Sequence, residues 1–290
     1  MLTFNDARLL DGRLVDVTVG GGRITAVEPA GELPASGDHV ELDGHVLIPG
    51  LWCAGIRFGE WAVASRSGHA ADELGELPED SLDTWAHEAG EAAATRGLVG
   101  AVDLGPAGAP DAWLRRFTAG FDELRIAVGV GPERLEPVIA AGLVGGSALH
   151  ASGLLTLGPL VLTPGEASDE ALLRRARSFG LEIAVEAGDA DAAELRRAFA
   201  AAGARGTIVP PRGAAGEGLD PWPGIAAAVG AGASVERAVE ASARSRIAVG
   251  EPADLVVLGA DPRELRASEL REQPVAATMV AGRFSYDAIR

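Results

Sequence analysis

The chain has 290 residues, of which 47% are apolar and 23% charged, with a formal net charge of −17. This size and composition are typical of a globular protein with one large domain, or with one domain and a small module. The negative charge repels phosphate backbones and anionic membrane surfaces, so nucleic acid and membranes are excluded as expected partners.

Cysteine content and hydropathy predict a cytoplasmic protein. Cys53 is the only cysteine, so no disulfide can form within the chain. Residues 1–11 lack the basic stretch and apolar core of a signal peptide. No run approaches the ~18 consecutive apolar residues that read as a membrane span. Every basic residue is an arginine, and the sequence contains no lysine.

Short β-hairpins are predicted for the first part of the chain. Asp11-Gly12, the glycine triplet 20–22 and Asp43-Gly44 are turn signals between short apolar runs. The triplet is not followed by the Lys and Ser/Thr of a phosphate loop, which favours a hairpin. The predicted strands are 7–10, 14–19, 23–27, 40–42 and 46–48.

From residue 51 to residue 248, strands and helices alternate, as in α/β proteins. The strand candidates are apolar almost throughout, which is typical of parallel strands buried on both faces. Ser168, followed by Asp169 and Glu170, is predicted to be the N-cap of a helix. The predicted strands are 51–58, 98–104, 124–130, 154–160, 181–186 and 206–210, and the other predicted helices are 81–96, 191–202 and 234–244.

The last part of the chain returns to β-structure. Residues 253–258 and 275–280 are predicted strands, and Ala281-Gly282 forms a turn into 283–286. We expect these strands to pair with the N-terminal hairpins, so that both chain ends form one small β-sandwich.

Residues 49–57, Pro-Gly-Leu-Trp-Cys-Ala-Gly-Ile-Arg, resemble the start of the barrel in the amidohydrolase superfamily, where the pattern is Pro-Gly-Leu-x-Asp-x-His-x-His. Residues 250–258, Gly-Glu-Pro-Ala-Asp-Leu-Val-Val-Leu, and 280–283, Val-Ala-Gly-Arg, are similar to its closing strands. Residues 180–189, Gly-Leu-Glu-Ile-Ala-Val-Glu-Ala-Gly-Asp, and 219–225, Leu-Asp-Pro-Trp-Pro-Gly-Ile, resemble the amidohydrolase-3 branch.

This resemblance implies a fold in which a TIM barrel is joined to a small β-sandwich. We therefore expect an α/β protein with a TIM-barrel-like domain of six to eight βα units at 51–248, and a sandwich domain formed by 1–50 and 249–290. A complete barrel takes about 250 residues, and the segment 51–248 is shorter than this. We therefore expect that βα units are missing, and that they are missing between residues 202 and 206. Missing units leave strand edges open, and a homodimer is one way to cover them.

The resemblance also implies one or two divalent metals that assist hydrolysis of C–N, C–O or P–O bonds, but the metal ligands are not matched. The two histidine positions of the first strand are Gly55 and Arg57, and neither residue offers a lone pair to a metal. The histidine of the fifth strand falls on Glu186, and the carboxylated lysine has no counterpart. We therefore expect no metal, and the alternative is one divalent metal such as zinc.

Active sites of this fold lie at the carboxyl ends of the barrel strands. Arg57 is hypothesised to replace the metal as the local cation, either in an ion pair with a carboxylate or as the group that holds an anionic ligand. The candidate catalytic residues are Asp103, Glu186 and Asp189, and the candidate ligand-binding residues are Arg57, Glu60 and His150.

Three functions follow from these observations. The first is a protein of the amidohydrolase family that has lost metal-dependent hydrolysis and keeps the fold to bind a small molecule or a partner. The second is an active hydrolase of amide or cyclic amide C–N bonds with a reorganised site. The third is a structural subunit of an active paralogue. The fold by itself does not select the substrate.

Overall fold

The computed structural model describes residues 1–32, 37–59, 79–105, 109–187, 192–209 and 218–289. The chain forms two compact units, the first comprising Met1–Cys53, Glu88–Gly100 and Leu219–Arg290, and the second Ala54–His87 and Ala101–Gly218. In the described ranges, no helix has both the length and the apolar character needed to cross a membrane.

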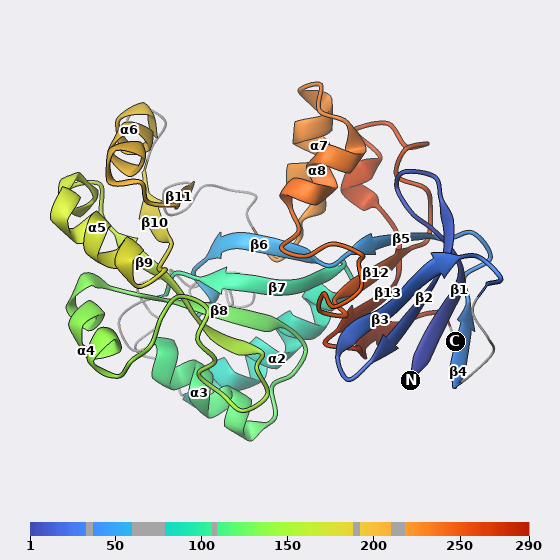
Figure 1. Cartoon of the computed structure of the whole chain (residues 1–290), viewed down its shortest axis with the longest axis horizontal. Coiled ribbons are helices and arrows are strands. Elements are labelled where there is room, and N and C mark those ends of the chain that lie inside the picture. The colour runs from blue at the N-terminus through green and yellow to red at the C-terminus, as the bar shows by residue number, and fades with distance from the viewer. Residues whose placement is uncertain (33–36, 60–78, 106–108, 188–191, 210–217, 290) are drawn as a thin grey trace. The chain divides into compact units, whose positions relative to one another are not determined.

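Strands from both ends of the chain form one mixed sheet of eight strands. β12 (Leu255–Leu258) pairs antiparallel with β5 (Val46–Pro49), and Figure 1 shows β12 and β13, in red, beside the blue N-terminal strands. The predicted pairing of the tail with the N-terminal hairpins is therefore confirmed. The other strands are β1 (Leu2–Arg8), β2 (Leu14–Gly20), β3 (Arg23–Pro29), β4 (Asp38–Glu41), β13 (Val275–Val280) and β14 (Arg283–Asp287).

This sheet folds back on itself around one apolar core. Arg23, at the start of β3, forms an isolated bridge with Pro252, close to β12. Phe4 of β1 and Phe284 of β14 meet edge to face, with ring centroids 6.1 Å apart. Buried side chains from β1, β2, β5, β12 and β13 share this core. Apolar burial of this kind is the main force that holds the two chain ends together.

The first strand begins earlier than its sequence predicts. β1 starts at Leu2, whereas the prediction begins at residue 7. Asp6 adopts a left-handed φ of +52°, and the register with β2 shifts between Phe4 and Ala7. This β-bulge interrupts the alternation of apolar and polar residues by which a strand is recognised.

The second sheet has six strands in the order β11-β10-β9-β8-β7-β6. The pairs that join β8, β9, β10 and β11 are parallel. All six predicted barrel strands are present, and the α/β, TIM-barrel-like fold is confirmed, with six barrel strands among the described residues. They are β6 (Leu51–Ile56), β7 (Leu98–Asp103), β8 (Arg125–Val130), β9 (Leu155–Leu162), β10 (Ile183–Glu186) and β11 (Gly206–Val209).

Helices follow the strands as the alternating pattern predicts. Ser234 caps α8 through its Oγ, which accepts from the backbone N–H of Arg237 at 3.3 Å. α3, α4 and α7 lie outside the helices proposed from the sequence. The helices are α2 (Glu79–Ala94), α3 (Ala109–Ala119), α4 (Leu135–Ala140), α5 (Glu170–Ser178), α6 (Ala192–Ala202), α7 (Trp222–Gly230) and α8 (Val235–Ala241).

The N-cap of α5 is Asp169, so the prediction of Ser168 is wrong by one residue. The Oδ1 atom of Asp169 accepts hydrogen bonds from the N–H groups of Ala171 and Leu172, at 2.9 and 3.1 Å. Ser168 instead ends a short 3₁₀ turn, and its hydroxyl lies 3.5 Å from the carbonyl oxygen of Pro164. The carboxylate satisfies two otherwise unpaired donors of the first helical turn.

Replacing Asp169 with alanine should lower the free energy of unfolding by about 1 kcal/mol, because two N–H groups of the first turn lose their acceptor. Ser168→Ala is the matched control, and its effect should stay below about 0.5 kcal/mol. Urea unfolding of both variants measures the difference. A larger loss in Ser168→Ala would contradict the assignment of the cap.

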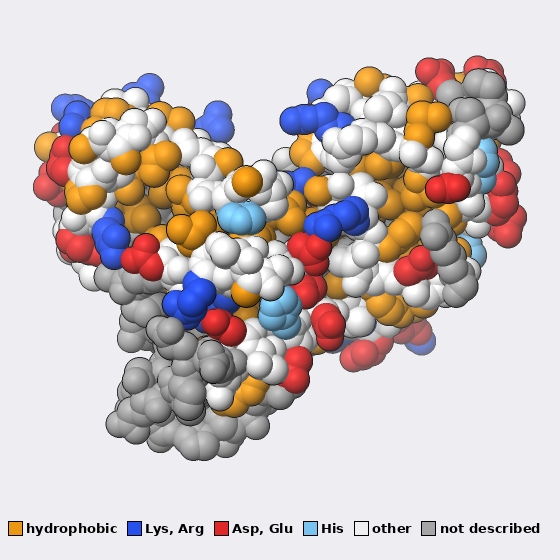
Figure 2. Space-filling model, turned by 90° about the horizontal axis from the view of Figure 1, so that it is seen from below, with side chains coloured by type: hydrophobic (Ala, Val, Ile, Leu, Met, Phe, Trp, Pro, Cys, Tyr) orange, Lys and Arg blue, Asp and Glu red, His pale blue; other side chains and the backbone are white. Residues whose placement is uncertain are grey.

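The carboxylates that make the chain acidic are scattered over its surface. On the face shown in Figure 2, Asp and Glu side chains lie among arginine and apolar side chains. Within the described residues, the acidic residues buried from solvent are Asp16, Asp103 and Asp254. Asp16 and Asp254 accept backbone N–H groups of neighbouring turns in the first unit. Asp103 is the one that lies at a barrel strand.

Candidate functional site

The carboxyl ends of the first two barrel strands bring two predicted site residues to one edge of the sheet. Arg57 directly follows β6, and Asp103 is the last residue of β7. The N–H of Leu104 donates to the carbonyl oxygen of Ile56 at 2.7 Å, which joins the two strand ends. This edge is the face on which barrels of this kind build their sites.

Asp103 is buried, with 3% of its surface exposed, and three N–H groups bind its carboxylate. Oδ1 accepts from the backbone N–H of Phe58 at 3.1 Å and of Gly105 at 2.9 Å, and Oδ2 accepts from Nε1 of Trp113 at 2.6 Å. Burial raises the pKa of Asp103, and these hydrogen bonds oppose that rise. Because both oxygens are occupied, the geometry favours a positioning role for Asp103 over proton transfer to a ligand.

Arg57 is half-buried and directed at the backbone of the neighbouring strand end. Its Nη1 donates to the carbonyl oxygen of Leu104 at 3.1 Å. The donors to Asp103 are Phe58, Gly105 and Trp113, so the hypothesised ion pair between Arg57 and Asp103 is not formed. The side chain of Glu186 lies outside the part of the chain that the structure describes, so the alternative ion pair between Arg57 and Glu186 stays a prediction.

Gly55 occupies the place of the first metal-binding histidine in the resembled pattern, and apolar side chains surround it. A Cβ atom added at Gly55 would lie 2.7 Å from Cγ1 of Val209 and 3.0 Å from Cδ1 of Leu104. Side-chain atoms do not approach a real Cβ as closely as 2.7 Å, and 3.0 Å is an unusually tight contact, so an imidazole at this position requires Val209 to move and crowds Leu104. Among the residues of this edge that the structure describes, Gly55 and Arg57 therefore do not fit the metal that the fold implies.

Of the other predicted site residues, the structure describes His150 and the backbone of Glu186, and His150 lies away from this edge. His150 precedes β9 and lies on a turn at its amino end, where Nδ1 is 3.0 Å from Oγ of Ser152 and the ring is 5.8 Å from that of Phe117. Glu186 ends β10, and its backbone pairs with Val209. Glu60 and Asp189 lie outside the described residues. In the described ranges, no three His, Cys, Asp or Glu residues gather closely enough to hold a metal ion.

Sequence reasoning missed the residues that fill and fix this edge. Trp113, which donates to Asp103, stands in α3 with Phe117 four residues later, and both are buried. That spacing is a helix signal that could have placed Trp113 on an inward face. No local signal predicts that Val209 packs against Gly55, because the contact joins the first and last strands of the sheet.

Comparisons with known proteins give a clear result for the fold. No protein-family model matches the sequence, and no curated protein matches it. Solved structures do match. The 5-methylcytosine deaminase of Klebsiella pneumoniae liganded with 5-fluorocytosine is 13% identical, with 98% of this chain and 97% of that chain covered and a TM-score of 0.65.

Two further enzymes match over similar lengths. An adenosine deaminase from Xanthomonas campestris with bound zinc is 13% identical over 99% of this chain and 93% of that chain, with a TM-score of 0.66. A Xaa-Pro dipeptidase with methionine bound in its active site is 12% identical over 98% and 99%, with a TM-score of 0.67. The chain has the fold of the amidohydrolase superfamily. The fold implied by the sequence resemblance is thereby confirmed, and fold alone does not assign a reaction.

Proposed function

We propose that this chain uses the amidohydrolase fold to bind a small anionic molecule, and that it does not carry out metal-dependent hydrolysis. The observation that carries the proposal is the environment of Gly55. Val209 and Leu104 occupy the space that a metal-binding side chain would need. A catalytic metal of this fold needs several protein ligands that converge on one ion and leave a position open for water.

Arg57 supports the choice of an anionic ligand. Its guanidinium is half-buried at the edge where this fold builds its sites, and the carbonyl oxygen of Leu104 fixes the direction of one of its amino groups. A guanidinium forms paired hydrogen bonds with a carboxylate or phosphate, and its charge does not titrate at physiological pH. The chain as a whole is acidic, so a local arginine is needed to favour an anion.

A second candidate function is hydrolysis of C–N bonds with a reorganised site. Two of the enzymes of similar fold are named as deaminases, and one of them holds zinc. Asp103, with a pKa raised by burial, Glu186 and Asp189 are the residues from which such a site would be built. The subunit of an active paralogue stays a third prediction, which copurification of a second chain would support. The homodimer and the cytoplasmic location also stay predictions.

Metal content separates the first two candidates. After dialysis against excess zinc and manganese, and then against metal-free buffer, the untagged protein should retain far less than one metal ion per chain by mass spectrometry. Near-stoichiometric metal would overturn the proposal and direct attention to Asp103, Glu186 and Asp189. Turnover of an amide or cyclic amide by the metal-free protein would favour the second candidate.

Replacing Arg57 with glutamine tests the ligand-binding role. Acetate, N-acetylglycine, succinate and inorganic phosphate are suitable probes, each followed by the rise in melting temperature of the full chain. At least one should stabilise the wild type, and Arg57→Gln should abolish that shift. Arg57→Lys should retain only part of it, because an ammonium does not form the paired bonds.

The same variants distinguish binding from structure. The melting temperature of Arg57→Gln without ligand should lie within about 3 °C of the wild type, corresponding to a loss of less than about 1 kcal/mol. A much larger fall would show that Arg57 acts in a structural ion pair. Arg174→Gln is the control, since Arg174 is exposed within α5 and its replacement removes the same charge without touching a strand end.

A further inference from the structure

A groove lies within the first unit, away from the residues discussed so far. It has a volume of about 560 Å³ and runs between the turn that joins β1 to β2 and α8 with the segment that follows it. Its floor is apolar and includes Leu9, Leu47, Val239 and Ile247. A groove of this volume with an apolar floor and a charged rim has the size and character of a small-molecule site.

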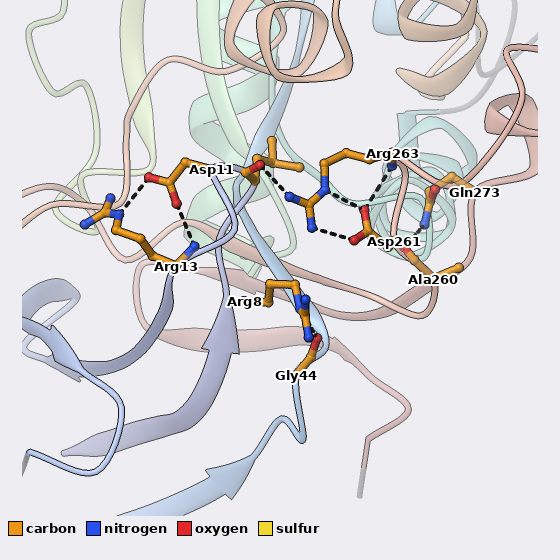
Figure 3. A network of polar contacts seen from close by, with 9 residues as sticks. Arg8, Asp11, Arg13, Gly44, Ala260, Asp261, Arg263 and Gln273 are labelled. Atoms are coloured by element: carbon orange, nitrogen blue, oxygen red, sulfur yellow. Dashed lines mark hydrogen bonds and ion pairs between the residues drawn. The ribbon is translucent and has the colours of Figure 1, made fainter.

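One wall of the groove is held in place by the polar contacts shown in Figure 3. Asp11 accepts from the backbone N–H of Arg13 at 3.0 Å and from its Nε at 2.7 Å, which closes the turn. The carbonyl oxygen of Leu10 accepts from Nη1 of Arg263 at 2.9 Å. Asp261 in turn holds Arg263 through Nε and Nη2, at 2.9 and 2.6 Å. Contacts within the protein therefore hold this wall in place, without a contribution from a ligand.

The opposite wall is equally well fixed. α8 is capped by Ser234, and its Val239 is fully buried. Beyond the helix, Arg23 donates from Nη1 to the carbonyl oxygen of Gly250 at 2.7 Å. A preformed groove loses little conformational entropy when it binds, which favours small ligands.

The arginines that line the groove already have partners. Arg13 is paired with Asp11 at 2.7 Å, and Arg246 with Glu251 at 3.5 Å. The guanidinium of Arg244 stacks on the ring of Trp52, 4.5 Å from its centroid. These positive charges are therefore engaged within the protein.

Two carboxylates that line the groove have no ion-pair partner among the described residues. Glu236 and Glu240 lie four residues apart on α8, so both project from one side of the helix toward the groove. Across the described residues, neither forms an ion pair. The negative charge of Glu236 acts on Arg263, but the hydrogen bonds of Arg263 are with Asp261 and Leu10. The groove thus combines an apolar floor with an excess of negative charge on one wall.

We propose that this groove binds a small organic cation, an amine with an apolar body, whose ammonium group lies between Glu236 and Glu240. The apolar body would lie against the apolar floor and remove the partly exposed surface of Ile247 from water. The ammonium group would donate charge-assisted hydrogen bonds to the two carboxylates. This site is independent of the anionic ligand proposed for Arg57, so each can fail while the other stands.

Titration of the full chain with n-hexylamine tests the proposal, with n-hexanol as the neutral probe of equal length. Methyl NMR should show saturable shifts at Val239 and Ile247, and n-hexanol should bind at least about fivefold more weakly, because it lacks the charge. Glu236→Gln/Glu240→Gln should weaken n-hexylamine about tenfold or more.

A control is needed because a chain of net charge −17 attracts every cation weakly. Glu28→Gln/Glu32→Gln removes two exposed carboxylates outside the groove and changes the net charge equally. Its affinity for n-hexylamine should change less than about twofold at 0.15 M salt. Equal weakening in both double variants, or shifts without saturation, would show diffuse attraction and overturn the proposal.

Discussion

Gly55→Ala should lower the free energy of unfolding by about 2 kcal/mol. The added methyl would lie 2.7 Å from Cγ1 of Val209 and 3.0 Å from Cδ1 of Leu104, which forces the packed strand ends apart. The backbone at Gly55 is not in the left-handed region, so the penalty comes from crowding and not from φ. Gly55→His, which restores the residue of the resembled metal pattern, should destabilise more strongly still.

Gly224→Ala is the matched control for this effect. Gly224 lies in α7, and a Cβ added there meets no atom within 4 Å. Alanine is the better helix former, so this variant should gain about 0.5–1 kcal/mol. Urea unfolding of both variants measures the contrast. A Gly55→Ala protein as stable as the wild type would show that the space beside β6 is open, and would remove the main support for the proposed loss of the metal site.

Val209→Ala should relieve the crowding that Gly55→Ala introduces. Alone, it should cost about 1–3 kcal/mol by opening a small cavity. In the double variant with Gly55→Ala, the new methyl fills part of that cavity, so the combined loss should fall short of the sum by about 1 kcal/mol. Strict additivity would show that the two residues do not touch.

Asp103→Asn should also destabilise the protein, by about 1–3 kcal/mol at acidic pH, because an amide group would face the N–H of Trp113 and leave a buried donor unpaired. Urea unfolding gives the free energy directly. Asp38→Asn is the control, since Asp38 is exposed, and its effect should stay within about 0.5 kcal/mol.

The pH dependence of this difference follows from the pKa of Asp103, which burial raises. A carboxyl with a raised pKa binds more protons in the folded than in the unfolded state, so stability falls as pH rises. The fall begins near the unfolded value of about 3.9 and ends above the folded pKa. The advantage of the wild type over Asp103→Asn should therefore be largest at acidic pH and shrink toward neutral pH. A constant difference between pH 4 and 8 would contradict the raised pKa.

A double-mutant cycle with Trp113→Phe checks the hydrogen bond itself. Phenylalanine keeps most of the ring packing against Phe58 but removes the donor to Asp103. Once the donor is absent, Asp103→Asn should cost about 1 kcal/mol less than in the wild-type background. If Asp103→Asn lowers the free energy of unfolding equally in both backgrounds, the effect of Asp103 arises from its hydrogen bonds with the backbone N–H groups of Phe58 and Gly105.

The sequence alone determined the barrel strands and their order, whereas α3, α4 and α7 were not predicted. The six barrel strands were predicted because each is a continuous apolar run, a property of neighbouring residues that needs no knowledge of the fold. The misplaced cap at Ser168 and the late start of β1 arose where a local exception, an aspartate one position on and a bulge at Asp6, broke the simple pattern. Residue identity also sufficed to show that Gly55 and Arg57 cannot be metal ligands.

Only the tertiary structure decided what occupies the place of those ligands. Val209 and Leu104 reach Gly55 because the strands adopt a particular register and packing, and Trp113 reaches Asp103 because α3 folds back onto β7. The groove beside α8 likewise needs a turn near residue 11 and a helix near residue 238 to meet within one unit. Such contacts join residues far apart in the chain, and their distances depend on the packing of the whole unit, which no local pattern records.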